Sequence, residues 1–433
     1  MKLVVAIFLM LTSYCAWASD ASAVDIAIEK SNQGEWTVTY KMQKPAARLS
    51  FIRNPDDSRT KRWQPESPGF EIVYVDNHEY IVRTDSTDFT EVSVRLTPTY
   101  QHLPKDYAPF SPYSDGGVLI YTGRLFACID TCSNNVNRWK FSMSVPENEH
   151  IVMKGQVQTG KARWIDTNEG MNIYVGSQQP IETPNVIAVI DPGLPETIRR
   201  SLDADIPELM TYFESKLGKL QGTKPMLFAS YANTAGHSSQ GGTLPNQIFM
   251  HWNVNNLDKQ VEDDSFLNDT IWFFAHEVAH LYQWNNKAGF NGEQHESWLH
   301  EGHAEWSAAS ALQELFPEKG NYVTTKIANA SSQCSKGLLE TSLVEAASEG
   351  RFDLYYSCGL LIHQAIDAQL EKSGKRDSYS LWADFRKRAG KGNEEASDVF
   401  LSLTETCTSK TFVKKIERIL EGKLASPEES LNL

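Results

Sequence analysis

Two histidines and a glutamate near the middle of the chain have the types and spacing that suit metal-assisted hydrolysis. His276 and His280 are four residues apart, and Glu277 directly follows the first, giving the pattern His-Glu-x-x-His. On a helix, residues four apart lie on the same face, so both imidazoles can bind one ion. Glu277 lies beside them, where it can act as a general base toward a metal-bound water. The motif predicts a catalytic zinc ion; the alternative is a buried helix with two ordinary core histidines.

A third ligand is expected because catalytic zinc usually takes three protein ligands and keeps one position open. The segment from Trp298 to Trp306 contains two glutamates four residues apart. We predict that Glu301 is the third ligand. Glu305, one helical turn later, is expected to accept a hydrogen bond from the outer nitrogen of a ligand histidine. The flanking His300 and His303 are expected in surface or packing positions; the alternative is that one of them faces the cleft.

The two ligand segments must lie on helices for this geometry to arise. The apolar residues 271–275 precede the first motif, and Asn268 or Asp269 is a candidate cap for the helix that contains it. From Asp269 onward the periodicity is mostly helical. The metal-binding residues are therefore predicted on two neighbouring helices.

The segment before these helices has a mixed pattern of predicted strands and a helix. Three apolar segments predict strands over 186–190, 225–231 and 247–252. The helical periodicity between the first two strands predicts a helix over 195–217. The Gly- and Ser-rich residues 236–242 are expected to form a loop. The strand over 247–252 is expected to border the site and to pair with an extended peptide. Within that loop, Gly241 and Gly242 would let a substrate backbone approach closely.

The first part of the chain has the period of β-strands. Residues alternate between apolar and polar over Trp36–Tyr40 and Glu91–Leu96, and residues 71–83 suggest a hairpin. Turn residues at intervals of about ten favour a sandwich-like domain. The segment Arg53–Pro68 is expected to be a long loop. We therefore predict a β domain over 19–180, a catalytic domain over 181–315 and a helical part over 316–433.

Export is predicted by the first residues of the chain. Lys2, an apolar stretch and the small-x-small pattern Ala16-Trp17-Ala18 are typical of a signal peptide over residues 1–18. Lipid attachment at Cys15 is the less favoured alternative because the bulky Tyr14 precedes it. No later segment approaches a transmembrane length. The mature protein is therefore expected in a periplasm or outside the cell.

Five of the six cysteines follow the predicted signal peptide. Cys128 and Cys132 are close enough in sequence to bridge a small loop, as an exported chain permits. Cys334 can pair with Cys358 or with Cys407, which leaves one thiol over. The formal net charge of -14 excludes nucleic acid as an expected partner, since nucleic-acid binding needs a positive surface.

The residues from His276 to His280, followed by Trp298 to Ala304, resemble the gluzincin zinc metallopeptidases. They are most similar to aminopeptidase-N-type and glycyl-aminopeptidase-type enzymes. The resemblance implies an α+β chain with an antiparallel N-terminal β domain, a thermolysin-like catalytic domain and a helical C-terminal part. It also implies that Glu301 is the third zinc ligand and that Glu305 orients a ligand histidine.

The resemblance also implies a catalytic tyrosine downstream. The family's Y-x-x-G element matches Tyr356 to Gly359, so Tyr356 is the candidate for stabilising an oxyanion, with Tyr355 the second choice. Alternatively both tyrosines are core aromatics. The family's G-x-M-E-N element is absent, and residues 241–244 occupy its place without an acid.

These patterns together predict an exported zinc metallopeptidase that acts on a peptide or protein. Glu277 would take a proton from the attacking water and later pass it to the leaving amine. The choice between exopeptidase and endopeptidase stays open. Two alternatives are a zinc hydrolase of a non-peptide substrate and a non-catalytic peptide- or cell-wall-binding protein that retains a metal site.

Overall fold

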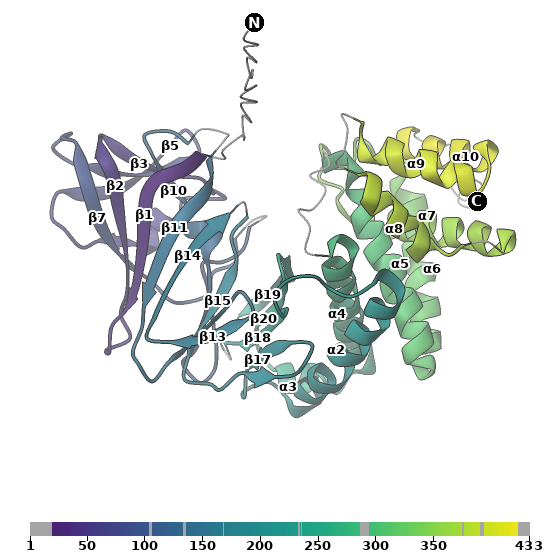
Figure 1. Cartoon of the computed structure of the whole chain (residues 1–433), viewed down its shortest axis with the longest axis horizontal. Coiled ribbons are helices and arrows are strands. Elements are labelled where there is room, and N and C mark those ends of the chain that lie inside the picture. The colour runs from purple at the N-terminus through teal and green to yellow at the C-terminus, as the bar shows by residue number, and fades with distance from the viewer. Residues whose placement is uncertain are drawn as a thin grey trace, which may run out of the picture.

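The chain divides into a strand-rich first half and a helical second half, with a smaller sheet between them (Figure 1). This arrangement confirms the predicted α+β class with an N-terminal β domain and a C-terminal helical part. The predicted signal peptide and the last eleven residues lie outside the described residues. The computed structural model describes residues 20–103, 106–132, 136–167, 169–232, 234, 236–285, 294–374, 376–389 and 394–422.

The N-terminal part consists of fifteen strands in three sheets, among the residues described. The sheets have the strand orders β14-β11-β1-β2-β7-β4, β10-β3-β6-β5 and β13-β12-β15-β9-β8. Strand bounds are β1 Asp20–Lys30, β2 Trp36–Ala46, β3 Arg48–Phe51, β4 Gln64–Pro65, β5 Phe70–Val75, β6 His78–Arg83, β7 Phe89–Leu96, β8 Phe110–Pro112, β9 Val118–Tyr121, β10 Ala127–Ile129, β11 Val136–Ser144, β12 His150–Met153, β13 Gln156–Thr159, β14 Lys161–Thr167 and β15 Asn172–Gly176.

Alternation in these strands produces the core of the β domain. In β2, Trp36, Val38 and Tyr40 point inward while the residues between them are more exposed, as the period of two requires. One pairing departs from the expected antiparallel pattern, because β1 and β11 are parallel. A parallel pair needs a crossover connection, and here the nine strands between β1 and β11 in the chain supply it.

The segment Arg53–Pro68 is not the loop that its composition predicted. It contains the short helix α1 (Ser58–Arg62) and strand β4. Arg59 is buried, pairs with the buried carboxylate of Glu79 and donates to the backbone oxygen of Arg124 at 2.8 Å. The segment is therefore ordered by a buried ion pair, which hydrophobic periodicity does not reveal.

The smaller sheet lies between the β domain and the helices, with strand order β16-β17-β18-β20-β19. Its inner strands β17 and β18 are buried on both faces, and β20 largely so, which explains their mostly apolar sequences. In β17, Ile187 and Val189 pack with Tyr174 of the β domain, whereas Ala188 and Ile190 face the helices. Bounds are β16 Ile181–Glu182, β17 Ile187–Ile190, β18 Met226–Tyr231, β19 His237–Leu244 and β20 Gln247–Val254.

The predicted loop over 236–242 is mostly strand β19, which forms the edge of this sheet. It pairs antiparallel with β20 from His237 to Leu244, and Gly241 lies opposite Met250. Gly and Ser have low strand propensity, so tertiary pairing rather than local preference makes this strand. The predicted border strand, β20, is consequently interior, and β19 takes its place at the edge.

Helices make up the remainder of the described chain, and one continuous core runs through them. That core extends from Val186 to Leu420, so it crosses the predicted boundary at residue 315, which stays a prediction. Bounds are η1 Thr122–Leu125 within the β domain, then α2 Glu196–Leu217, α3 Leu257–Gln260, α4 Asp264–Trp284, η2 Gln294–Glu296, α5 Ser297–Leu315, η3 Pro317–Lys319, α6 Gly320–Gly337, α7 Asp353–Ser373, α8 Ser378–Arg388, α9 Ala396–Cys407 and α10 Lys410–Glu421.

Helix α4 begins earlier than predicted. Its cap is Asp263, whose side chain accepts a hydrogen bond from the backbone nitrogen of Ser265. Asn268 and Asp269, the predicted caps, lie inside the helix. Asp269 instead accepts a hydrogen bond from Tyr322 of α6 at 2.6 Å. Several cap-forming residues precede the apolar run, and only the first of them lies at the helix terminus.

Two disulfide bonds link the described cysteines. Cys128 pairs with Cys132, and Cys334 of α6 pairs with Cys358 of α7, which leaves Cys407 as the free thiol. Within the described parts of the chain, no helix combines the length and the apolar character needed to cross a bilayer.

Candidate active site

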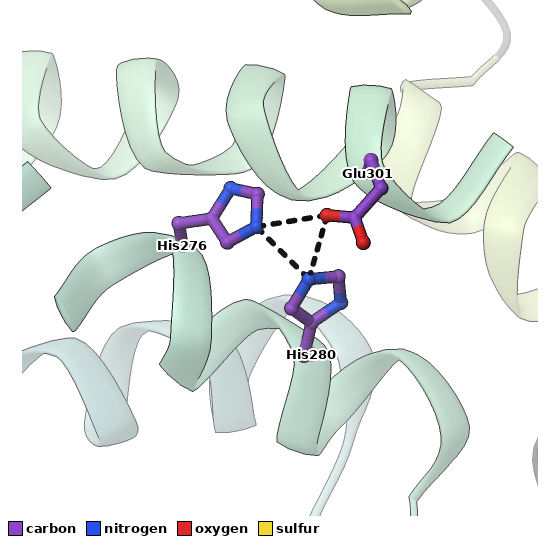
Figure 2. Close-up of side chains that lie close together, drawn as sticks. All are labelled: His276, His280 and Glu301. Carbon is purple, nitrogen blue, oxygen red and sulfur yellow. Dashed lines mark hydrogen bonds and ion pairs between the residues drawn. The ribbon is translucent and has the colours of Figure 1, made fainter. Parts of the chain in front are cut away.

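The three predicted metal ligands converge at the junction of α4 and α5 (Figure 2). The Nε2 atoms of His276 and His280 are 2.9 Å apart. The carboxylate oxygen Oε2 of Glu301 lies 3.1 Å from the first and 3.2 Å from the second. Three possible ligand atoms from two helices therefore face one point.

The packing of α5 explains how Glu301 reaches this point. A Cβ atom on Gly302 would lie 2.4 Å from the Cα of Gly359 in α7, so only glycine allows this approach. Trp298 and Leu299, in the preceding turn, are buried in the core. The glycine after the ligand and the buried residues before it thus set the rotation and depth of α5.

The donor set suits a small divalent cation. Tetrahedral zinc with bonds of about 2.0–2.1 Å holds its ligand atoms roughly 3.3 Å apart, close to the separations of 2.9–3.2 Å here. Both outer Nδ1 atoms face side-chain oxygens, which favours the proton on Nδ1 and a lone pair on each inner Nε2. Two lone pairs and a carboxylate that face one another repel, and a cation between them would relieve this repulsion. Two histidines and a glutamate are also a ligand set that zinc takes in hydrolases.

Two different side chains hold the ligand histidines from outside. Oε1 of Glu305 lies 3.0 Å from Nδ1 of His276, and Trp272 donates to its other oxygen at 2.9 Å. His280 is held instead by Gln283, whose Oε1 lies 2.8 Å from Nδ1. The role of Glu305 as an acceptor from His276 stays a prediction. Gln283 was not predicted, although its spacing of three from His280 puts it on the same helix face.

The histidines and glutamates of this group shift one another's pKa values. Burial lowers the pKa of His276, but its contacts with Glu301 and Glu305 outweigh this effect and raise that pKa well above the usual value. Burial raises the pKa of Glu301, but the charge of His280 and hydrogen bonds from the histidines hold it well below the usual value. Without a cation, these shifts favour a proton on His276 and a charged carboxylate on Glu301.

Glu277 lies beside this group and is held by the edge strand β19. Its side chain is buried, and the hydroxyl of Thr243 lies 2.8 Å from its Oε2 and 2.9 Å from its backbone oxygen. A hydroxyl that donates to a carboxylate fixes its direction as well as its charge. Thr243 was not predicted, because nothing in the sequence places it next to Glu277.

Gly241 and Gly242 lie on β19 just before Thr243. A Cβ atom on Gly242 would lie 2.5 Å from the hydroxyl oxygen of Tyr107, and one on Gly241 would lie 2.5 Å from the ring of Phe273. The close approach that we predicted for a substrate is thus made here by side chains of the protein. A role for these glycines in substrate binding stays a prediction.

Tyr107 brings the β domain to the site. Its ring packs against Phe249 of β20 at 4.8 Å between centroids. Burial raises its pKa, and the charges of Glu277, Glu169 and Glu301 raise it further. The adjacent backbone is anchored to β19, since Ala108 donates to the side chain of Gln240 at 2.9 Å. Nothing in the sequence predicts this contribution, because more than a hundred residues separate Tyr107 from β19.

Of the two candidate tyrosines, only Tyr356 faces the ligands. Its ring stacks on that of His276 with 5.7 Å between centroids, and its side chain is 39% exposed. Burial and the charges of Glu301 and Glu277 raise its pKa, so its hydroxyl stays protonated. Tyr355 is buried, and its hydroxyl accepts a hydrogen bond from Ala347 at 3.1 Å. The core-aromatic alternative therefore describes Tyr355.

The histidines that flank Glu301 have different environments. His303 is fully buried and stacks on Trp382 with 4.0 Å between centroids, which agrees with the predicted packing role. His300 is not in a plain surface position, because its Nε2 lies 3.3 Å from Oε1 of Glu301. His300 thus fits the alternative position beside the ligand group, because residues one apart on a helix point about 100° apart and a long side chain can still reach its neighbour's carboxylate.

No protein-family model matches the chain, and no curated protein matches it in sequence. Solved structures match nearly all of it. An aminopeptidase N family protein from Idiomarina loihiensis is 13% identical with a TM-score of 0.66, and the match covers 94% of this chain and 78% of that one. Native yeast LTA4 hydrolase is 14% identical with a TM-score of 0.55, covering 95% and 69%. A mutant M1 zinc metallopeptidase from Deinococcus radiodurans, bound to a Tyr-Ser-Ala substrate, is 14% identical with a TM-score of 0.52, covering 94% and 95%.

These likenesses establish the fold. The chain has the architecture of the aminopeptidase N and M1 metallopeptidase structures, which confirms at the level of fold the resemblance drawn from His276 to His280 and Trp298 to Ala304. Within that fold, the group of His276, His280 and Glu301 is the one set of its kind among the described residues.

Proposed function

We propose that the protein is a zinc-dependent peptidase. The observation that carries this proposal is the convergence of His276, His280 and Glu301, with ligand atoms 2.9–3.2 Å apart and Glu277 beside them. A bound zinc ion would lower the pKa of a water molecule to about 7 and polarise a substrate carbonyl. The fold of the M1 metallopeptidase structures supports a peptide as the substrate.

The chain's own residues supply the proton transfers. Glu277 takes a proton from the attacking water and then delivers it to the leaving amine, while the Thr243 hydroxyl holds its carboxylate in one direction. Tyr356 donates a hydrogen bond to the oxyanion that develops on the carbonyl oxygen. A tyrosine hydroxyl is protonated at neutral pH and can therefore donate this hydrogen bond. A general base held in this way argues against a protein that only binds peptides.

We further propose that the protein is exported to a periplasm or to the outside of the cell. Residues 1–18 have the pattern of a signal peptide. The disulfides Cys128–Cys132 and Cys334–Cys358 support an oxidising compartment. Whether the enzyme cuts from an end or internally follows from its substrate contacts. Residues 241–244, which occupy the place of the family's G-x-M-E-N element, contain no acid.

The decisive experiment is to profile cleavage of a diverse peptide library by the purified protein, with and without a chelator. We expect chelator-sensitive cleavage, and the cut positions will distinguish an exopeptidase from an endopeptidase. Glu277→Gln should retain zinc by metal analysis and lose turnover by at least about 10³-fold, since it removes the base but not a ligand. Undiminished turnover by Glu277→Gln would refute the mechanism. Zinc-dependent hydrolysis of esters but no peptides would favour the non-peptide alternative.

A further inference from the structure

Gln283 forms a second, uncharged support beneath the metal site. It is fully buried in the last turn of α4, three residues after His280. Its side chain makes three polar contacts: Oε1 lies 2.8 Å from Nδ1 of His280, and Nε2 lies 2.8 Å from the backbone oxygen of His300 and 3.0 Å from Nδ1 of His303. A buried amide with all these contacts has one orientation.

The contacts determine where the protons lie. The backbone oxygen of His300 can only accept, so the neighbouring amide atom is nitrogen and the opposite atom is the Gln283 oxygen. That oxygen can only accept, so His280 carries its proton on Nδ1 and turns its Nε2 lone pair toward the ligand group. The second amide hydrogen points at Nδ1 of His303, which accepts it.

Helix α8 of the C-terminal part holds this arrangement from behind. The indole nitrogen of Trp382 donates to the backbone oxygen of Gln283 at 3.1 Å, and its ring stacks on His303. Arg386 donates to the backbone oxygen of Tyr282 at 2.9 Å. The last carbonyls of a helix lack partners within it, so α8 satisfies the end of α4.

We infer that Gln283 is the positioning residue for His280, and that Trp382 of α8 locks Gln283 in place; this inference rests on the proposed zinc site. The two ligand histidines are then supported differently, because His276 meets the carboxylate of Glu305 whereas His280 meets an amide. The C-terminal helices would accordingly contribute to metal affinity although they supply no ligand.

The test compares zinc dissociation constants, measured by chelator competition, of the full-length parent and its variants. Gln283→Met keeps the volume and removes every polar contact, so we expect zinc affinity to fall by about 10–100-fold. Gln283→Glu keeps an oxygen acceptor for His280 and should recover most of that loss. A packing role predicts the reverse order, with the apolar variant binding well and the charged variant poorly.

Gln247→Met is the matched control. Gln247 is also buried, and it exchanges two hydrogen bonds with the backbone of Asn172 in the β domain. Its loss should lower the melting temperature of the metal-free protein comparably and leave zinc affinity unchanged. Zinc binding by Gln283→Met within threefold of the parent would overturn the inference. If Gln283→Met does not fold, Gln283→Asn decides in the same way, because its shorter amide cannot span the three contacts. A parent that binds no zinc would instead refute the proposed function itself.

Discussion

Tyr355 and Tyr356 are adjacent in the chain, yet removal of the Tyr356 hydroxyl should lower kcat, whereas removal of the Tyr355 hydroxyl should lower stability. The hydroxyl of Tyr356 faces the ligand group, and its ring stacks on His276. Loss of one oxyanion donor costs about 10²–10³ in kcat, or roughly 2.7–4 kcal/mol. We expect Tyr356→Phe to lie at the lower end, near 10²-fold, because this side chain is 39% exposed and water can replace part of the hydrogen bond.

The effect of Tyr356→Phe should appear in kcat and leave KM within about twofold, since the donor acts on a charge that exists only in the transition state. The free energy of unfolding of Tyr356→Phe should differ from that of the parent by no more than about 0.5 kcal/mol, as for other partly exposed positions. Tyr355→Phe removes a buried acceptor from the backbone of Ala347. It should cost about 1 kcal/mol of stability and leave kcat unchanged.

Steady-state kinetics on the best peptide from the library and thermal unfolding of both variants test this pair of predictions. Zinc content is measured alongside, so that a loss of metal is not mistaken for a loss of the donor. The reasoning would be refuted if Tyr356→Phe kept full kcat, or if Tyr355→Phe reduced kcat while remaining as stable as the parent.

Three other predictions concern the Thr243 hydroxyl, zinc binding and the buried His251. Thr243→Val, which removes the hydrogen bond to Glu277, should lower kcat/KM by about 10–100-fold, whereas Thr243→Ser should stay close to the parent. Zinc at about one hundred times its dissociation constant should raise the free energy of unfolding by roughly 2.7 kcal/mol, and Glu301→Ala should lose this gain in calorimetry. Burial lowers the pKa of His251 to about 3, below its usual 6.5, so the unfolded chain binds the extra proton between these values. Stability should therefore fall as pH decreases through this window by about 1.4 kcal/mol per unit, and an unchanged slope in His251→Gln would contradict this.

Much of the candidate metal site could be predicted because it depends on local geometry. A spacing of four along a helix puts His276 and His280 on one face whatever the rest of the fold does. The segment with Glu301 and Glu305 has the same periodicity, and the strands of the β domain have the period of two. These features are set by covalent geometry and hydrophobic pattern over a few residues.

The features that could not be predicted correctly are those that depend on contacts between distant segments. Strand β19 was predicted as a loop because its Gly and Ser residues form a strand only when β20 pairs with them. The segment over 53–68 was misjudged because a buried ion pair between Arg59 and Glu79 orders it. The choice of Cys358 as the partner of Cys334 needed the packing of α6 against α7.

Residue types and helical spacing are enough to predict which side chains can bind a metal. Their surroundings follow from tertiary packing, which puts Thr243 against Glu277, Gln283 behind His280, and Tyr107 of the β domain next to β19. Thr243 and Tyr107 belong to segments whose position relative to α4 is set by packing of the whole core. Gln283 lies on the same helix as His280, but its amide is oriented by contacts with His300 and His303 of α5. Such contacts carry little local pattern, because a threonine or a tyrosine has the same propensity whether or not it meets a catalytic group.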